Sequence, residues 1–264
     1  MTGRRKPERM DLADAAEALA GARRLVVFTG AGMSAESGVP TFRDALTGLW
    51  ERFDPQALAT PEAFRADPAL VWGWYEWRRA AVGRAEPNPG HRAVAALAAR
   101  VPDTVVVTQN VDDLHERAGS AATVHLHGSL LTPRCSACAE PAPAPGAGAE
   151  PGEGRRLEPP RCGHCAAPVR PGVVWFGEAL PEPAFAAAVE AAYRCDVLLT
   201  VGTSGLVYPA AEIPQVAARR GGTVIQVNPE ETPLDAVCAV NLHGPAARVL
   251  PALVRAAWGD PAGA

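Results

Sequence analysis

Four of the six cysteines fall into two C-x-x-C pairs, Cys135 with Cys138 and Cys162 with Cys165. Paired cysteines of this kind are typical of a thiolate metal site rather than of disulfides. Four thiolates surround a zinc ion completely and leave no position for water or substrate, so we expect one structural Zn²⁺. The alternative is that His164, inside the second pair, replaces one cysteine ligand.

A glycine-rich turn follows the apolar run Leu25–Thr29. Gly30, Gly32 and Ala35 match the pattern G-x-G-x-x-G/A, whose glycines let the backbone approach a pyrophosphate at a helix N-terminus. The match is weak by itself, because glycine turns after strands are common. The only lysine of the chain is Lys6, which excludes a P-loop and a kinase-type phosphate clamp.

Short polar side chains follow two further predicted strands. They are Gly202, Thr203 and Ser204 after the run 196–201, and Asn228, Pro229 and Glu230 after the run 223–227. Such residues at the carboxyl ends of parallel strands can hold a ribose and a phosphate. Asn228 suits a ribose diol, and no arginine stands beside it to bind a 2′-phosphate. The pattern therefore favours NAD over NADP.

The elements that must position these residues alternate along the chain. Short, nearly all-apolar runs predict strands that are buried on both faces of a parallel sheet: Leu25–Thr29, Thr104–Thr108, Thr123–Leu126, Val173–Phe176, Val197–Val201 and Thr223–Val227. Helical segments lie between them: Leu12–Ala20, His91–Arg100, Pro183–Tyr193 and Ala210–Arg220. This alternation predicts an α/β fold with a doubly wound, Rossmann-type parallel sheet.

Two segments interrupt the alternation. Residues 44–88 have no strand signal and predict a helical insertion. Residues 132–171 hold the paired cysteines and a loop rich in Ala, Pro and Gly, which predicts a zinc-binding module. The Rossmann-type NAD-binding domain then consists of residues 1–43, 89–131 and 172–264.

The composition is that of a globular protein, with 264 residues of which 48% are hydrophobic and 20% charged. A net charge of −4 disfavours a dedicated nucleic-acid binder. No apolar run approaches the ~20 residues that a membrane helix needs, and acidic residues stand where a signal peptide would be apolar. We therefore expect a cytoplasmic protein without nucleic-acid or membrane partners; its oligomeric state is left open.

Several blocks of the sequence resemble the sirtuin family, in the same order. They are GAGMSAESGVPTFR (30–43), TQNVDDLHERAG (108–119), HLHGSL (125–130), the two C-x-x-C pairs, VVWFGE (173–178), GTSGLVYPA (202–210) and VNPE (227–230). The resemblance implies NAD⁺-dependent removal of acyl groups from protein lysines. In similar enzymes the acyl oxygen attacks the ribose C1′ as nicotinamide leaves, and the acyl group departs as O-acyl-ADP-ribose.

The resemblance implies that His127 is the general base, which takes a proton from a ribose hydroxyl. An imidazole, with an unperturbed pKa of ~6.5, can accept a proton near neutral pH. Taken alone, a histidine at a strand end is more often merely hydrogen-bonded. We assign structural roles to the other histidines, which are His91, His115, His125, His164 and His243.

The resemblance also implies a set of NAD⁺ contacts. The residues expected to contact the phosphates and ribose are Gly30, Ala31, Gly32, Ala35 and Glu36. The loop expected to close over NAD⁺ contains Thr41, Phe42, Arg43 and Trp50. The nicotinamide side takes Gln109, Asn110, Val111 and Asp112, with Asp112 accepting from the carboxamide. The adenosine half takes Gly202, Thr203, Ser204, Asn228, Pro229, Glu230 and Ala246.

Tyr75 and Arg78 lie three residues apart in a helical stretch, which places both side chains on one helix face. An arginine on a helix is usually a solvated charge. The desuccinylating and demalonylating branch of the sirtuins nevertheless carries this Tyr-x-x-Arg pair, together with a small residue, here Ala59, in the acyl channel. The resemblance implies succinyl and malonyl substrates, besides acetyl, whose distal carboxylate binds Tyr75 and Arg78. A mainly deacetylating enzyme is the alternative.

Two other classes of function are weighed against this one. A zinc-dependent NAD oxidoreductase is disfavoured because a shell of four cysteines is closed. A non-catalytic zinc-ribbon module that binds nucleic acid is disfavoured by the acidic balance of the chain. The expected partner is an acylated lysine in a protein, bound as an added strand between residues 176–178 and 206–208.

Overall fold

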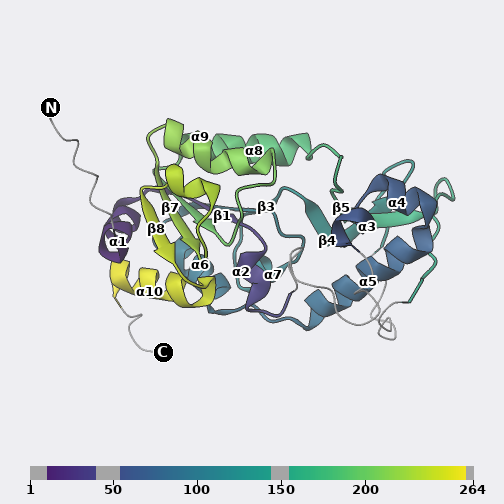
Figure 1. Cartoon of the computed structure of the whole chain (residues 1–264), viewed down its shortest axis with the longest axis horizontal. Helices are drawn as coiled ribbons and strands as arrows, with labels where there is room; N and C mark the ends of the chain where they lie inside the picture. Colours follow the sequence, from purple (N-terminus) through teal and green to yellow (C-terminus); the bar gives the residue numbers. More distant parts are fainter. Residues whose placement is uncertain (1–10, 40–53, 144–154, 260–264) are drawn as a thin grey trace.

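The computed structural model describes residues 11–39, 54–143 and 155–259 (Figure 1). In this part of the chain, six parallel strands form one sheet in the order β3-β2-β1-β6-β7-β8. The strands are β1 (Arg24–Thr29), β2 (Asp103–Thr108), β3 (Thr123–His125), β6 (Val197–Val201), β7 (Thr223–Asn228) and β8 (Val240–His243). The strand order reverses between β1 and β6, so the loops that follow these two strands border the crevice where such sheets bind ligands.

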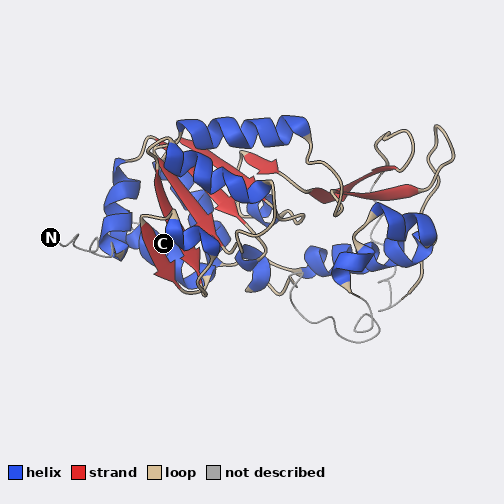
Figure 2. Ribbon diagram, turned by 45° about the horizontal axis from the view of Figure 1, so that its top comes forward, coloured by secondary structure: helices blue, strands red, loops and turns tan. Residues whose placement is uncertain are grey.

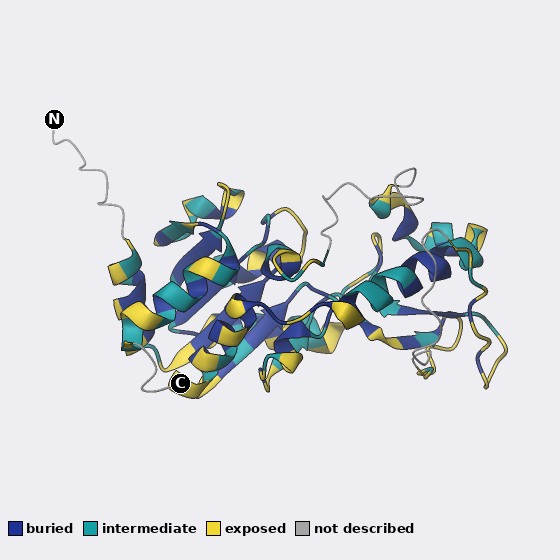
Figure 3. Cartoon of the chain, turned by 90° about the horizontal axis from the view of Figure 1, so that it is seen from below, coloured by how far each residue is buried: buried dark blue, intermediate teal, exposed yellow. Residues whose placement is uncertain are grey.

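Helices cover both faces of this sheet (Figure 1). One face packs against α1 (Leu12–Gly21), α6 (Pro89–Arg100) and α10 (Ala246–Trp258), and the other against α8 (Glu182–Arg194) and α9 (Ile213–Arg219). Because side chains alternate along a strand, β1 sends Leu25 and Val27 into the first core and Val26 and Phe28 into the second. The strands are accordingly buried while the outer faces of the helices are exposed (Figure 3).

A smaller lobe extends from one end of the sheet (Figure 2). It contains the antiparallel pair β4 (Gly128–Cys135) and β5 (Val169–Val173) and the helices α3 (Pro55–Leu58), α4 (Pro61–Ala66) and α5 (Pro68–Arg84). Each of these helices begins with proline, preceded by Asp54, Thr60 or Asp67, whose side chain accepts a backbone N–H of the first turn. Proline at the first helical position loses no hydrogen bond, and a capping side chain supplies one.

The expected α/β fold with a doubly wound parallel sheet is confirmed. The strand expected at Val173–Phe176 is wrong, because the strand there is Val169–Val173 and belongs to the small antiparallel sheet. The residues beyond Val173 leave the ladder, and Trp175 packs into the core of the small lobe. The small sheet also begins at Gly128, before the expected module boundary at 132.

Short elements complete the described chain. They are α2 (Gly32–Ala35), α7 (Leu114–Arg117), η2 (Ala210–Glu212) and η3 (Pro233–Ala236). The sequence did not predict β8, a short strand at the edge of the sheet beyond β7. Among the described residues, no helix has the length and apolar character needed to cross a membrane.

Candidate active site

The glycine turn after β1 packs directly against the loop after β6. The N–H of Gly32 donates to the carbonyl oxygen of Gly202 at 2.8 Å, and the N–H of Gly202 donates to Val227 at 2.9 Å. A Cβ on Gly32 would lie 2.8 Å from the Cα of Gly202, and Gly202 itself has a φ of +58°. Glycine is therefore needed here for the close approach of two backbones, and not only for the approach of a phosphate, as the sequence pattern suggested.

A chain of hydrogen bonds connects α2 to the loop after β2. The amide nitrogen of Asn110 donates to the hydroxyl of Ser34 at 3.0 Å, and this hydroxyl donates to the carboxylate of Asp112 at 3.0 Å. The second Asp112 oxygen accepts the N–H of Leu114 at 3.2 Å. Burial raises the pKa of Asp112 above its usual value. A carboxylate oriented in this way can accept an N–H of a carboxamide, which fits the nicotinamide contact expected of Asp112.

Gln109 links the nicotinamide side of the crevice to His127. Its side-chain amide donates to the hydroxyl of Thr203 at 2.9 Å, and its carbonyl oxygen lies 3.0 Å from Nδ1 of His127. Because a carbonyl oxygen only accepts, Nδ1 carries the proton and Nε2 presents a lone pair. Burial lowers the pKa of His127, which keeps this lone pair available at neutral pH. This geometry fits the general base that the resemblance implies.

His125 lies near His127 in the chain but makes different contacts. Its Nδ1 lies 3.0 Å from the carbonyl oxygen of Asn110, and its Nε2 lies 2.7 Å from the carboxylate of Glu116. Burial lowers the pKa of His125, but the partners Glu116 and Asn110 outweigh burial and raise it. Since both ring nitrogens are engaged, the structural role expected of His125 fits its surroundings.

The residues expected around the ribose and adenosine lie at the carboxyl edge of the sheet. The carboxylate of Glu36 accepts the N–H of Ala247 at 2.8 Å, next to the buried Ala246. The amide nitrogen of Asn228 donates to the carbonyl oxygen of Glu230 at 2.9 Å and so orders the loop after β7. Thr41, Phe42, Arg43 and Trp50, expected in the closing loop, lie outside the described residues.

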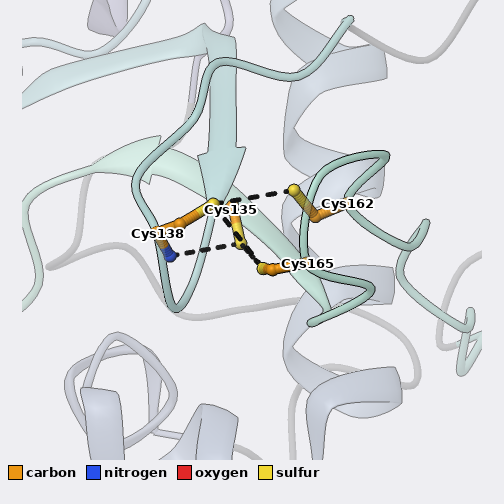
Figure 4. A group of neighbouring side chains, drawn as sticks. All are labelled: Cys135, Cys138, Cys162 and Cys165. Carbon is orange, nitrogen blue, oxygen red and sulfur yellow. Dashed lines mark hydrogen bonds between the residues drawn. The ribbon is translucent and has the colours of Figure 1, made fainter.

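The four paired cysteines converge at the end of the small sheet (Figure 4). The Sγ–Sγ distances are 3.4 Å for Cys135 and Cys165, 3.6 Å for Cys138 and Cys165, and 3.7 Å for Cys138 and Cys162. A zinc–sulfur bond of about 2.3 Å sets the edge of a thiolate tetrahedron at about 3.8 Å. The four side chains therefore fit a tetrahedral Zn²⁺ without rearrangement.

Backbone N–H groups support these sulfurs. Cys138 and Ala137 donate to Sγ of Cys135 at 3.4 Å, and these hydrogen bonds lower the pKa of the Cys135 thiol. His164 contributes its backbone N–H to Sγ of Cys162 at 3.4 Å, and its ring is not part of the cluster. The donor set is thus four cysteines, and the alternative in which His164 is a ligand has no support from the geometry.

The expected acyl-binding residues meet in the core of the small lobe. Ala59, Tyr75 and Trp175 belong to one buried cluster, and the indole nitrogen of Trp175 donates to the hydroxyl of Tyr75 at 3.0 Å. Arg78, half-buried on the same helix as Tyr75, holds its guanidinium carbon 5.0 Å from the centroid of the Trp74 ring. Burial lowers the pKa of Arg78, while Tyr75 and Asp112 are close enough to oppose that shift. The arginine is therefore only partly exposed.

The segment after β5 joins this cluster to His127. The N–H of Val174 donates to the backbone oxygen of His127 at 2.8 Å, and the N–H of Phe176 donates to the backbone oxygen of Ala59 at 2.9 Å. Trp175 lies between these two donors in the chain, so its backbone is fixed between His127 and Ala59.

Residues 30–209 match the Sir2 family. The chain belongs to this family. An NAD-dependent protein deacylase of Methylococcus capsulatus is 63% identical over 236 residues, which cover 89% of this chain and 92% of the relative. A crystal structure of a Sir2 homologue with NAD shares 43% identity at a TM-score of 0.85, covering 96% of this chain and 95% of that one. A Sir2 protein bound to a myristoylated histone peptide shares 37% identity at a TM-score of 0.75, with 93% and 95% covered.

Membership of the Sir2 family agrees with the sequence resemblance, but some partners of the site residues were not predicted. Ser34, which connects Asn110 to Asp112, lies inside the block 30–43. Trp175 lies inside the block 173–178, and no short-range spacing relates it to Tyr75. Both residues lie inside motifs that the sequence analysis recognised in this Sir2 protein, and this position was the signal that could have identified them. The motifs did not indicate which residues they would bond to.

Proposed function

We propose that this Sir2 protein is an NAD⁺-dependent protein-lysine deacylase that removes acidic acyl groups, succinyl and malonyl, and accepts acetyl as well. One observation carries the acidic preference: Ala59 and Tyr75 belong to one buried cluster, and Arg78 lies over the Trp74 ring of the same cluster. A carboxylate placed there would accept a charge-assisted hydrogen bond from the guanidinium of Arg78. The small side chain of Ala59 leaves room that a bulkier residue would fill.

The chemistry assigned to the protein rests on His127. NAD⁺ would supply the ribose carbon that receives the acyl oxygen, with nicotinamide as the leaving group. Nε2 of His127 accepts the proton of a ribose hydroxyl, because Nδ1 is committed to the carbonyl oxygen of Gln109. Asp112 and Asn110 hold the nicotinamide side of the crevice, and Gly32 and Gly202 bring the loops on its other side together.

The protein substrate is expected to bind as an extended peptide between residues 176–178 and 206–208. Phe176, Leu206 and Tyr208 are 42%, 60% and 62% exposed, so both segments present apolar side chains to which a peptide could bind. A strand added there would be held through main-chain hydrogen bonds that read little sequence. The Sir2 relative bound to a myristoylated histone peptide supports an acylated peptide as substrate. As expected from the sequence, we also propose that the protein acts in the cytoplasm.

The test is a panel of one peptide that carries acetyl, malonyl, succinyl or myristoyl lysine, assayed with NAD⁺ for nicotinamide release and for O-acyl-ADP-ribose. We expect the highest kcat/KM on the succinyl and malonyl peptides. A maximum on the acetyl peptide would establish the mainly deacetylating alternative. Reduction of NAD⁺, seen as absorbance at 340 nm, would instead identify an oxidoreductase.

A further inference from the structure

Trp175 makes two specific contacts through different parts of its indole ring. Its Nε1–H donates to the hydroxyl of Tyr75 at 3.0 Å, and the guanidinium carbon of Arg170 lies 3.5 Å from the ring centroid. Trp175 and Tyr75 are each 3% exposed, so both contacts are shielded from water. Contact with a cation on the face of an indole is favourable, most of all when both groups are buried.

Arg170 and Glu178 hold this ring in place. Nη1 and Nη2 of Arg170 lie 2.6 and 2.8 Å from the two carboxylate oxygens of Glu178, and Nη2 also donates to the backbone oxygen of Val173 at 3.0 Å. The same carboxylate accepts the backbone N–H of Trp175 at 2.8 Å. A two-pronged ion pair of this kind has a defined geometry. It fixes both the backbone of Trp175 and the cation on which its ring rests.

The hydrogen bond from Trp175 determines where the proton of Tyr75 can point. A phenol has one proton to donate, and an indole N–H is a donor only. The Tyr75 hydroxyl therefore accepts from Trp175 and cannot return its own proton to that ring. Burial raises the pKa of Tyr75 to about 12, so the phenol keeps this proton. It is therefore available to an acceptor other than Trp175, and Arg78 lies close enough to Tyr75 for its charge to oppose the rise in pKa.

We propose that Trp175 is a positioning residue for acidic acyl groups: its indole N–H orients the Tyr75 hydroxyl toward the distal carboxylate, and the Arg170–Glu178 pair holds the indole. This inference rests on the proposed removal of acidic acyl groups, in which Tyr75 and Arg78 bind the distal carboxylate. The alternative is that Trp175 contributes only apolar surface to the acyl-binding region. Loss of apolar surface would lower the turnover of every acyl chain, whereas loss of an oriented phenol proton would lower the turnover only of chains that end in a hydrogen-bond acceptor.

The test compares succinyl-lysine and acetyl-lysine in one peptide, with wild type, Trp175→Phe, Tyr75→Phe and the double variant. Trp175→Phe keeps a buried aromatic ring and removes the N–H. One neutral hydrogen bond corresponds to about a 3- to 10-fold change. We expect the KM of the succinyl peptide to rise by about that factor with kcat little changed, and the succinyl-to-acetyl ratio of kcat/KM to fall.

The double variant decides whether Trp175 acts through Tyr75. If it does, Trp175→Phe has no further effect on the ratio in the Tyr75→Phe background, because the group that it orients is already absent. An equal fall of the ratio in both backgrounds, or equal losses on both peptides, would overturn the proposal. Trp72→Phe is the matched control, since it removes an indole N–H from α5 at a residue that is also buried; its ratio should equal that of wild type.

A second substitution separates the N–H from the volume of the ring. 3-Benzothienylalanine at position 175 keeps the bicyclic shape and replaces the N–H by sulfur. It should lower the ratio as Trp175→Phe does, even if Trp175→Phe impairs folding, and an unchanged ratio would refute the positioning role. If wild type does not turn over succinyl-lysine, the proposed function fails. If Arg78→Met lowers the ratio and both substitutions at 175 leave it unchanged, only this inference fails.

Discussion

Nδ1 of His127 lies 3.0 Å from the backbone carbonyl oxygen of Gln109. This contact fixes the tautomer of the imidazole, because only a protonated Nδ1 can bond to a carbonyl oxygen. The same Gln109 reaches Thr203 through its side chain. Gln109 therefore orients the imidazole of His127 and also connects the loop after β2 to the loop after β6. A displacement of either loop would change the orientation of this imidazole.

His127→Ala should leave folding and NAD⁺ binding intact and abolish acyl turnover. General-base assistance is typically worth ~10²–10⁴-fold, so a variant that keeps more than about a tenth of the wild-type rate would contradict the assignment. The measurement is nicotinamide release with an acylated peptide, alongside NAD⁺ binding by calorimetry. His243→Ala, at an exposed position of β8, is the control and should keep wild-type turnover.

The pH dependence of kcat/KM should report a base whose pKa is lowered. Burial lowers the pKa of His127, so its neutral, active form persists to lower pH than for an ordinary histidine, at ~6.5. Activity should fall as the pH is lowered, with the midpoint of this fall below the ~6.5 of an ordinary histidine. An acid limb centred above about 6.5 would point instead to His125, whose pKa is raised.

Cys135→Ser should cause loss of the metal and of the fold. Structural zinc contributes roughly 10–16 kcal/mol of apparent binding free energy, which is comparable with the ~5–15 kcal/mol net stability of a domain. We expect metal-free, aggregating protein, as measured by elemental analysis and thermal unfolding. Cys238→Ser lies outside the cluster and should keep its metal. A zinc-free Cys135→Ser protein that is well folded and fully active would refute the structural role.

Arg78→Met tests the acidic preference while keeping the apolar stem of the side chain. A charge-assisted hydrogen bond to a carboxylate is worth ~1.5–3 kcal/mol, so kcat/KM on succinyl-lysine should fall by roughly 10- to 150-fold. Acetyl-lysine has no carboxylate to lose, so the succinyl-to-acetyl ratio should fall as well. Equal falls of kcat/KM on both substrates would show that Arg78 does not bind the distal carboxylate and is an ordinary surface charge. Arg65→Met, on exposed α4, should leave the ratio unchanged.

Acid should destabilise the fold through two buried histidines. Burial lowers the pKa of His91 to about 3 and of His115 to about 4, and their rings lie 4.9 Å apart. Below ~6.5 the unfolded chain binds protons that the folded chain does not, so the free energy of unfolding falls as the pH falls.

His115→Gln isolates this effect, because it removes one titrating group from the pair. Between pH 6.5 and 5, wild type should lose stability faster than the variant, by up to about 1.4 kcal/mol per pH unit. The measurement is urea unfolding at each pH. Parallel curves for the two proteins would show that His115 does not titrate on unfolding in this range.

Local spacing in the sequence was enough to predict the paired cysteines as one group and the α/β alternation. Two cysteines in a C-x-x-C pair are brought close by one turn of backbone, and apolar runs between helical segments define strands whichever partners they later pair with. The family motifs likewise identified His127, Asp112 and the glycine turns as candidate site residues. These features depend on covalent connection and on short-range periodicity, which the sequence states directly.

Only the tertiary structure decided which distant residues meet. Trp175 donates to Tyr75 across 100 positions of the chain, and Ser34 bonds to Asp112 across 78. The apolar run at Val173–Phe176 reads as a strand of the large sheet, yet its backbone bonds to His127 and Ala59 because Trp175 packs into the small lobe. Burial and long-range packing select such partners, and neither is contained in the spacing of residues along the chain.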